Sequence, residues 1–208
     1  MKKYFKDDNL ESFFNLEVAK RKFNTIDPYD PFQLAYEYFI NYFKNEDVIT
    51  EADFFIAANF TYGWMPTMLK YKSENIKNDL KIGVALLNKV KFDGKKLDGG
   101  ELEALTHIVN NSIVGSSKLL HFIRPDLYPI WDSRVNGFLK DNKYTVKGTS
   151  YVNSINKYLA YIELCQKIIN NNEYEKVHKL FVKQFKEKHL DSNLLTKLRS
   201  IEQLMFLK

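Results

Sequence analysis

The chain has 208 residues, of which 45% are hydrophobic and 15% aromatic, and it carries a formal net charge of +5 at pH 7. This length and composition allow a substantial buried core. They argue against disorder and fit one domain over residues 1–208 or two small helical lobes. The excess of basic residues suits a polyanionic partner such as DNA without identifying one.

The start of the chain and its cysteine content bear on where the protein works. No apolar leader segment is expected at the N-terminus, because its residues include Lys2, Lys3, Lys6, Asp7 and Asp8. No run approaches the roughly 20 apolar residues of a membrane span. A cytoplasmic protein that does not enter a membrane is therefore expected. The single cysteine, Cys165, excludes an intramolecular disulfide and is expected to be a small core residue.

Helical periodicity dominates the first half of the chain. Asp30 as N-cap and Pro31 at the first helical position predict a helix whose apolar residues recur at spacings of three and four. These residues are Phe32, Ala35, Tyr36, Phe39, Ile40 and Phe43. Thr50 and Asp53 resemble a capping box and predict the start of another helix. Residues 60–65 are expected to form an aromatic loop with flexibility at Gly63.

Further apolar stripes follow over residues 155–169, 174–185 and 194–205, the last opened by Asp191. Two loops are expected, at residues 92–100 and 141–148. The first is a potential boundary between lobes 1–94 and 95–208. No segment alternates with period two, so the predicted fold class is all-α. Dispersed basic residues near the C-terminus predict a solvated helix face, not a DNA track: Lys183, Lys186, Lys188, Lys197 and Arg199.

The chemistry-bearing residues concentrate in residues 112–135. Gly115, Ser116 and Ser117 are expected to form a turn whose backbone amides open a helix, a suitable place for a phosphate. Lys118 would lie at the beginning of that helix. A Pro-containing extended segment would then deliver Asp132 to the N-cap of the next helix.

Each of these residues also has a plainer explanation when taken singly. A lysine is usually solvated, an aspartate before a helix is usually a cap, and an aromatic such as Trp131 usually packs. Gly115 could serve only to close a turn. The combination, and not any single residue, points to a site.

The order of these residues resembles that of the helix-hairpin-helix DNA glycosylases, in particular the 8-oxoguanine DNA glycosylase branch. In that family the hairpin turn reads Gly-Val-Gly-Thr-Lys and is followed by Val-Pro-Val-Asp. Here residues 114–117 fall on the turn, Lys118 on the catalytic lysine and residues 129–132 on the Pro-Val-Asp segment. The chain departs from the pattern in having one glycine in the turn, a shorter interval from Lys118 to Asp132, and no β-rich N-terminal lobe.

The resemblance implies two helical lobes with a cleft, and removal of a damaged base from DNA. Asp132 would stabilise the positive charge that develops on the sugar, and Lys118 would attack the anomeric carbon and allow strand cleavage. Gly115, Ser116, Ser117 and Arg134 would contact the nucleic acid. The extruded base would enter a pocket walled by Phe60, Tyr62, Trp64, His121 and Trp131.

No cofactor or metal is expected, because the four histidines show no ligand spacing. Two other functions stay open. The chain could be a non-catalytic nucleic-acid-binding module of the same fold, or a helical domain that binds another protein through its Tyr- and Phe-rich surface.

Overall fold

The computed structural model describes residues 10–65, 67–71, 75–141 and 154–207, and every regular element in them is helical. This confirms the all-α class. None of the helices in these residues has the length and apolar character needed to cross a membrane. The charged N-terminus and most of the loop expected at 141–148 lie outside the described residues.

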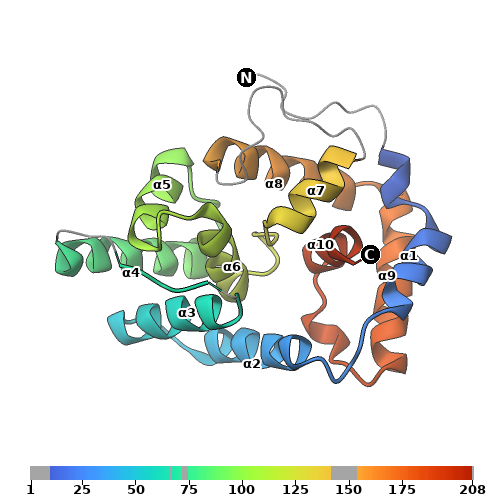
Figure 1. Ribbon diagram of the computed structural model, residues 1–208, viewed down its shortest axis with the longest axis horizontal. Coiled ribbons are helices and arrows are strands. Elements are labelled where there is room, and N and C mark those ends of the chain that lie inside the picture. The colour runs from blue at the N-terminus through green and yellow to red at the C-terminus, as the bar shows by residue number, and fades with distance from the viewer. Residues whose placement is uncertain (1–9, 66, 72–74, 142–153, 208) are drawn as a thin grey trace.

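Ten α-helices (α1–α10) and two 3₁₀ helices (η1, η2) make up the described part of the chain (Figure 1). In order they are η1 (Leu10–Phe13), α1 (Leu16–Asn24), α2 (Pro31–Asn45), α3 (Glu51–Gly63), α4 (Ile76–Asp93), α5 (Gly99–Ile108), α6 (Ile113–Ile123), α7 (Ser133–Asp141), α8 (Ile155–Ile169), α9 (Asn172–Glu187), η2 (Ser192–Leu194) and α10 (Lys197–Phe206).

Side-chain caps set most helix starts, as the sequence predicts. Asp30 accepts a hydrogen bond from a first-turn amide of α2, and Thr50 and Asp53 form the expected capping box of α3. The prediction that Asp191 opens the last helix is wrong. Asp191 caps η2, and Thr196 caps α10.

The prediction of an aromatic loop over residues 60–65 is also wrong for its first residues. Helix α3 runs through Gly63, so Phe60 and Tyr62 occupy its last turn. The aromatic side chain of Phe60 packs between helices, since it stacks on Phe39 of α2 with ring centroids 4.7 Å apart.

The helices fall into two groups (Figure 1). Helices α2–α6 pack on one another in one group, and α1 joins α7, α9 and α10 in the other. Helix α8 links the groups, because it contacts α5 as well as α9 and α10. The expected boundary at residue 94 does not divide the packing, since α5 and α6 lie against α3 and α4.

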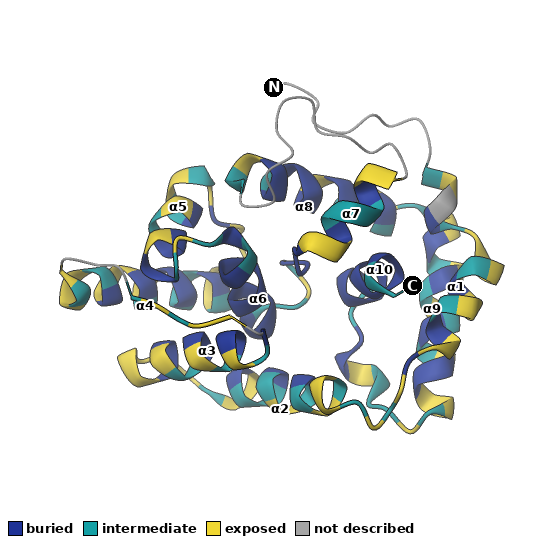
Figure 2. Ribbon diagram, viewed as in Figure 1, coloured by how far each residue is buried: buried dark blue, intermediate teal, exposed yellow. Residues whose placement is uncertain are grey.

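Helix α10 is enclosed by the second group and by α8. All residues from Leu198 to Met205 are buried, charged ones included, as the dark colour of this helix in Figure 2 shows. A helix buried on all sides cannot keep its charged residues in water. The charges on α10 must therefore find partners inside the protein.

One glycine in the first group sets how closely helices approach. A Cβ atom added at Gly83 of α4 would lie 2.6 Å from Cε2 of Phe54 and 3.2 Å from Cδ1 of Ile108. At Gly137 of α7, by contrast, no atom lies within 4 Å of the added Cβ. Both glycines occupy helix interiors, so they differ mainly in the space around them.

We therefore expect Gly83→Ala to lower the free energy of unfolding by about 1–2 kcal/mol, because overpacking outweighs the gain in helix propensity. Gly137→Ala should raise it by about 0.5–1 kcal/mol. Urea denaturation of both variants checks this. Equal stabilisation by the two substitutions would contradict the packing described for α4.

Candidate functional site

A helical hairpin precedes Lys118, but its turn lies earlier than the sequence suggests. Helices α5 and α6 pack together and are joined by residues 109–112, where Asn110 and Asn111 have φ angles of 57° and 54°. Asparagine enters this left-handed region more readily than most residues, so it replaces the glycine expected in the turn. The Asn110 side chain also fixes the turn by donating to the carbonyl of Met68.

The expectation that Gly115, Ser116 and Ser117 form a turn is wrong. All three are buried inside the first half of α6. The amide of Gly115 donates to Oγ of Ser112, the N-cap, and the amide of Ser116 donates to the carbonyl of the same residue. Gly115 is instead a close-packing position, because an added Cβ would lie 2.8 Å from Cζ of Tyr62.

Ser117 connects α6 to the segment before α7. Its Oγ accepts a hydrogen bond from the amide of Trp131 at 3.1 Å. The same Oγ lies within donating distance of the carbonyls of Val114 and Trp131, at 2.9 Å and 3.2 Å. Since Ser117 precedes Lys118 and Trp131 precedes Asp132, this link fixes the two candidate catalytic residues relative to one another.

The extended approach to Asp132 is held along its length. The carbonyl of Tyr128 accepts from His121, and that of Pro129 accepts from the Tyr158 hydroxyl at 3.2 Å. Asp132 then caps α7 as predicted, with Oδ1 accepting the amide of Val135 at 2.9 Å. The segment is therefore a rigid strap that presents its last side chain at a fixed place.

Lys118 is buried, with 9% of its surface exposed. Burial lowers the pKa of its amine, and the nearby charge of Arg199 lowers it further, while the charges of Asp132 and Glu202 oppose this change. The Nζ atom lies 5.4 Å from the ring centre of Trp64. A partly desolvated amine of this kind is a better nucleophile at neutral pH than a solvated one.

Asp132 is equally buried, and its charge acts on Lys118. The described residues contain no direct ion pair between the two side chains. They therefore interact through their charges and not through a direct contact.

Two charged residues of α10, Arg199 and Glu202, form a buried charged cluster with Lys118 and Asp132. The sequence analysis identified neither as a site residue. Arg199 and Glu202 are 6% and 2% exposed and form an ion pair with one another. The prediction that Arg199 belongs to a solvated face is therefore wrong. Its guanidinium lies 4.3 Å from the ring centre of Tyr36 and 5.9 Å from that of Trp64, the same ring that Lys118 approaches.

Burial raises the pKa of Glu202 to about 7, and the charge of Asp132 adds to this effect, whereas Arg199 and Lys118 oppose it. One signal for this pair is present in the sequence, a basic and an acidic residue three positions apart in an otherwise apolar stripe. That spacing is equally typical of a solvated helix face, so it does not identify burial.

His121 and Tyr36 form a neutral hydrogen-bonded pair beside the cluster. Nδ1 of His121 faces the carbonyl of Tyr128 at 2.6 Å, which requires the proton on Nδ1 and leaves Nε2 to accept from the Tyr36 hydroxyl at 2.8 Å. Burial and the charge of Arg199 lower the pKa of His121 to about 3. His121 therefore stays uncharged at neutral pH and holds Tyr36 in place.

The five residues expected to wall a base pocket make different contacts in the described part of the chain. Trp64 and His121 lie at the charged cluster, as described above. Phe60 stacks on α2, Tyr62 points at Gly115, and Trp131 packs on Tyr161 with ring centroids 5.0 Å apart. The last three are therefore packing residues.

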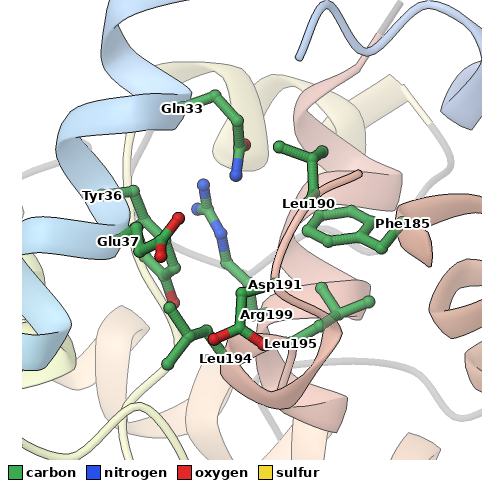
Figure 3. Close-up of a pocket in the computed structure, with 9 residues that line it drawn as sticks. All are labelled: Gln33, Tyr36, Glu37, Phe185, Leu190, Asp191, Leu194, Leu195 and Arg199. Atoms are coloured by element: carbon green, nitrogen blue, oxygen red, sulfur yellow. The ribbon is translucent and has the colours of Figure 1, made fainter. Parts of the chain in front are cut away.

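A small, solvent-open hollow lies between α2 and the α9–α10 region (Figure 3). Figure 3 shows the Arg199 guanidinium extending toward Gln33, with apolar side chains on the opposite side. The lining residues are Gln33, Tyr36, Glu37, Phe185, Leu190, Asp191, Leu194, Leu195 and Arg199. The hollow therefore meets the charged cluster at Tyr36 and Arg199.

Arg199 presents an unmet donor at this place. Its Nε is buried and has no hydrogen-bond partner among the described residues. Buried donors without partners are uncommon in native proteins, and a ligand or water is the usual explanation.

Arg134 is the remaining residue that the sequence analysis expected to contact nucleic acid. Arg134 is exposed at the start of α7, with its guanidinium 4.4 Å from the ring centre of Phe206, so it is free to meet a phosphate from the solvent side. The described residues contain no group of three potential metal-ligating side chains. Comparison of the chain with family models, curated proteins and solved structures finds no match.

The two serines of α6 offer a matched test of the link between α6 and the strap. Ser116 and Ser117 are both fully buried, but Oγ of Ser116 has no hydrogen-bond partner among the described residues. Ser117→Ala should lower the free energy of unfolding by about 1–3 kcal/mol, because the Trp131 amide loses its acceptor. Ser116→Ala should leave stability unchanged or raise it. Equal losses in chemical denaturation would contradict the assigned role of Ser117.

Proposed function

We propose that the protein is a DNA base-excision enzyme of the helix-hairpin-helix glycosylase type, with Lys118 as nucleophile and Asp132 as the stabilising anion. The single observation that carries this proposal is the convergence of the two side chains. Residues 14 positions apart are held together by the Ser117–Trp131 hydrogen bonds, and the charge of one acts on the other. The α5–α6 hairpin and the two groups of helices suit the same fold type.

The reaction places definite demands on these groups. The lone pair of the Lys118 amine forms a bond to the anomeric carbon, while the bond from that carbon to the base breaks and its electron pair leaves with the base. The amine then loses a proton, the bond to the ring oxygen opens as that oxygen is protonated, and a protonated imine remains. Asp132 stabilises the positive charge that builds on the sugar before the new bond is complete.

The hollow at Arg199 is the proposed receiving site for the extruded base. As it stands the hollow offers only about 10 Å³ to the centre of a water-sized sphere, so the side chains around it must move apart to admit a base. The guanidinium of Arg199 can donate to a carbonyl oxygen of a base, and Glu37 and Asp191 can accept from its N–H groups. DNA is the proposed partner, with Arg134 on the phosphate side.

A second candidate is a nucleic-acid-binding module of the same fold without catalysis. It is favoured by the burial of both reacting groups, each only 9% exposed, and by the fact that neither lines the hollow. For catalysis the side chains around Trp64 and Arg199 must open toward Lys118. For binding alone they need not move.

Covalent trapping separates the two candidates. With an oligonucleotide that carries an abasic site, the Lys118 amine should condense with the sugar aldehyde, lose water and form an imine that borohydride reduces to a stable adduct. We expect an adduct with the unmodified chain and a loss of at least roughly 100-fold in Lys118→Met, because the nucleophile is absent.

Lys157 supplies the matched control. It is also a buried lysine, 5% exposed, and its pKa is also lowered by burial, but it lies on α8 away from the cluster. Lys157→Met should keep the adduct. Equal adduct formation in Lys118→Met would overturn the assignment of the nucleophile, and salt-sensitive DNA binding with no adduct would select the binding module.

A further inference from the structure

The side chain of Trp64 lies against both the buried cluster and the solvent. Its ring centre is 5.4 Å from Nζ of Lys118 and 5.9 Å from the guanidinium carbon of Arg199. Lys118, Arg199 and Asp132 are buried, whereas Trp64 is half-buried. The Trp64 ring therefore stands where a molecule from solvent can approach the Lys118 amine.

Arg199, the other side chain beside this ring, is held on several sides. Its guanidinium is paired with the carboxylate of Glu202 and lies 4.3 Å from the ring centre of Tyr36. The Tyr36 hydroxyl is itself fixed by His121 at 2.8 Å. Moving Arg199 would leave the carboxylate of Glu202, which is 2% exposed, buried without its partner. Arg199 is therefore expected to stay in place.

Trp64 is held more weakly. It is the C-cap residue of α3, where that helix ends. Its indole Nε1 donates one hydrogen bond, at 3.0 Å, to the carbonyl of Phe32. Its ring meets those of Phe32 and Phe122 edge-on, with ring centroids 6.4 Å and 5.4 Å apart. An outward swing of the ring leaves no charge unpaired, and water can accept from the indole N–H once the bond to Phe32 breaks.

We propose that the Trp64 side chain is a gate that admits a carbonyl compound the size of a sugar to Lys118, while Arg199 stays fixed. The gate explains how an amine that is 9% exposed can meet a substrate without the unfolding of α6 or α10. Covering of the amine is a property of the free chain. The identity of the carbonyl compound, the aldehyde of an abasic sugar, rests on the proposed function.

Reductive labelling of the DNA-free chain with benzaldehyde tests the gate. The amine attacks the aldehyde carbon, water leaves, and cyanoborohydride adds hydride to the protonated imine, which gives a stable benzylamine that mass spectrometry locates. In Trp64→Ala the labelling rate of Lys118 should rise at least about 10-fold, because in the unmodified chain the ring must first give up its hydrogen bond and aromatic contacts. A wetter amine holds its proton more tightly, so a change in charge would lower the rate instead.

Phe55→Ala is the matched control. Phe55 is an aromatic residue of the same helix that is 36% exposed and packs on Phe54 and Tyr71. Its removal should leave the labelling of Lys118 unchanged. An unchanged Lys118 rate in Trp64→Ala, or an equal rise in Phe55→Ala, would overturn the gate.

Lys157, 5% exposed on α8, shows within the same experiment whether a variant is folded. If it becomes labelled in Trp64→Ala, that variant has lost its fold and Phe32→Ala decides instead. Phe32 is 54% exposed, and its removal takes away one ring that packs on Trp64 but keeps the carbonyl that holds the indole. Labelling of Lys118 should then rise by about 2- to 10-fold, and no rise would overturn the gate.

Trapping with abasic DNA is read separately from benzaldehyde labelling. An adduct in the unmodified chain that forms faster in Trp64→Ala would support both the gate and the proposed function. No adduct in either chain, with the labelling pattern as expected, would reject the proposed function and leave the gate standing.

Discussion

The site depends on the buried hydrogen bonds between Ser117 and the backbone of Trp131. These bonds join the interior of α6 to the strap that leads into α7, one position before Lys118 and one before Asp132. Because both ends are fully buried, water cannot compete for the bonds, and the geometry they impose is retained. The further bonds from His121 and Tyr158 to the strap extend this rigidity. A preorganised pair of charged groups is what catalysis by electrostatic stabilisation requires.

The sequence predicted those features of the fold that depend on a few neighbouring residues. The helical class, the caps at Asp30 and Thr50, and the N-cap role of Asp132 each follow from a few neighbouring residues. The position of the hairpin turn was not predicted, because Asn110 and Asn111 adopt the left-handed conformation there and the expected glycine lies inside α6. Gly115 is a close-packing position against Tyr62 of α3, a role that depends on a helix about 50 residues earlier in the chain.

The membership of the cluster could not be predicted, because it depends on tertiary packing. Arg199 and Glu202 have the spacing of a surface pair, and only the enclosure of α10 by its neighbours turns them into buried charges. Replacing such a pair by apolar residues is often neutral or stabilising in proteins, so stability gives little reason to keep it. The same helix supplies Arg199 both to this pair and to the lining of the hollow.

The most direct measurement of this account is a double-mutant cycle between Lys118 and Asp132. Lys118→Met removes the charge and keeps most of the volume, and Asp132→Asn removes the opposite charge while leaving a residue that can still cap α7. From urea denaturation we expect the two losses to differ from additivity by about 1 kcal/mol or more, because the charges act on one another within one buried cluster. Additivity within about 0.3 kcal/mol would mean that the two side chains do not share a site.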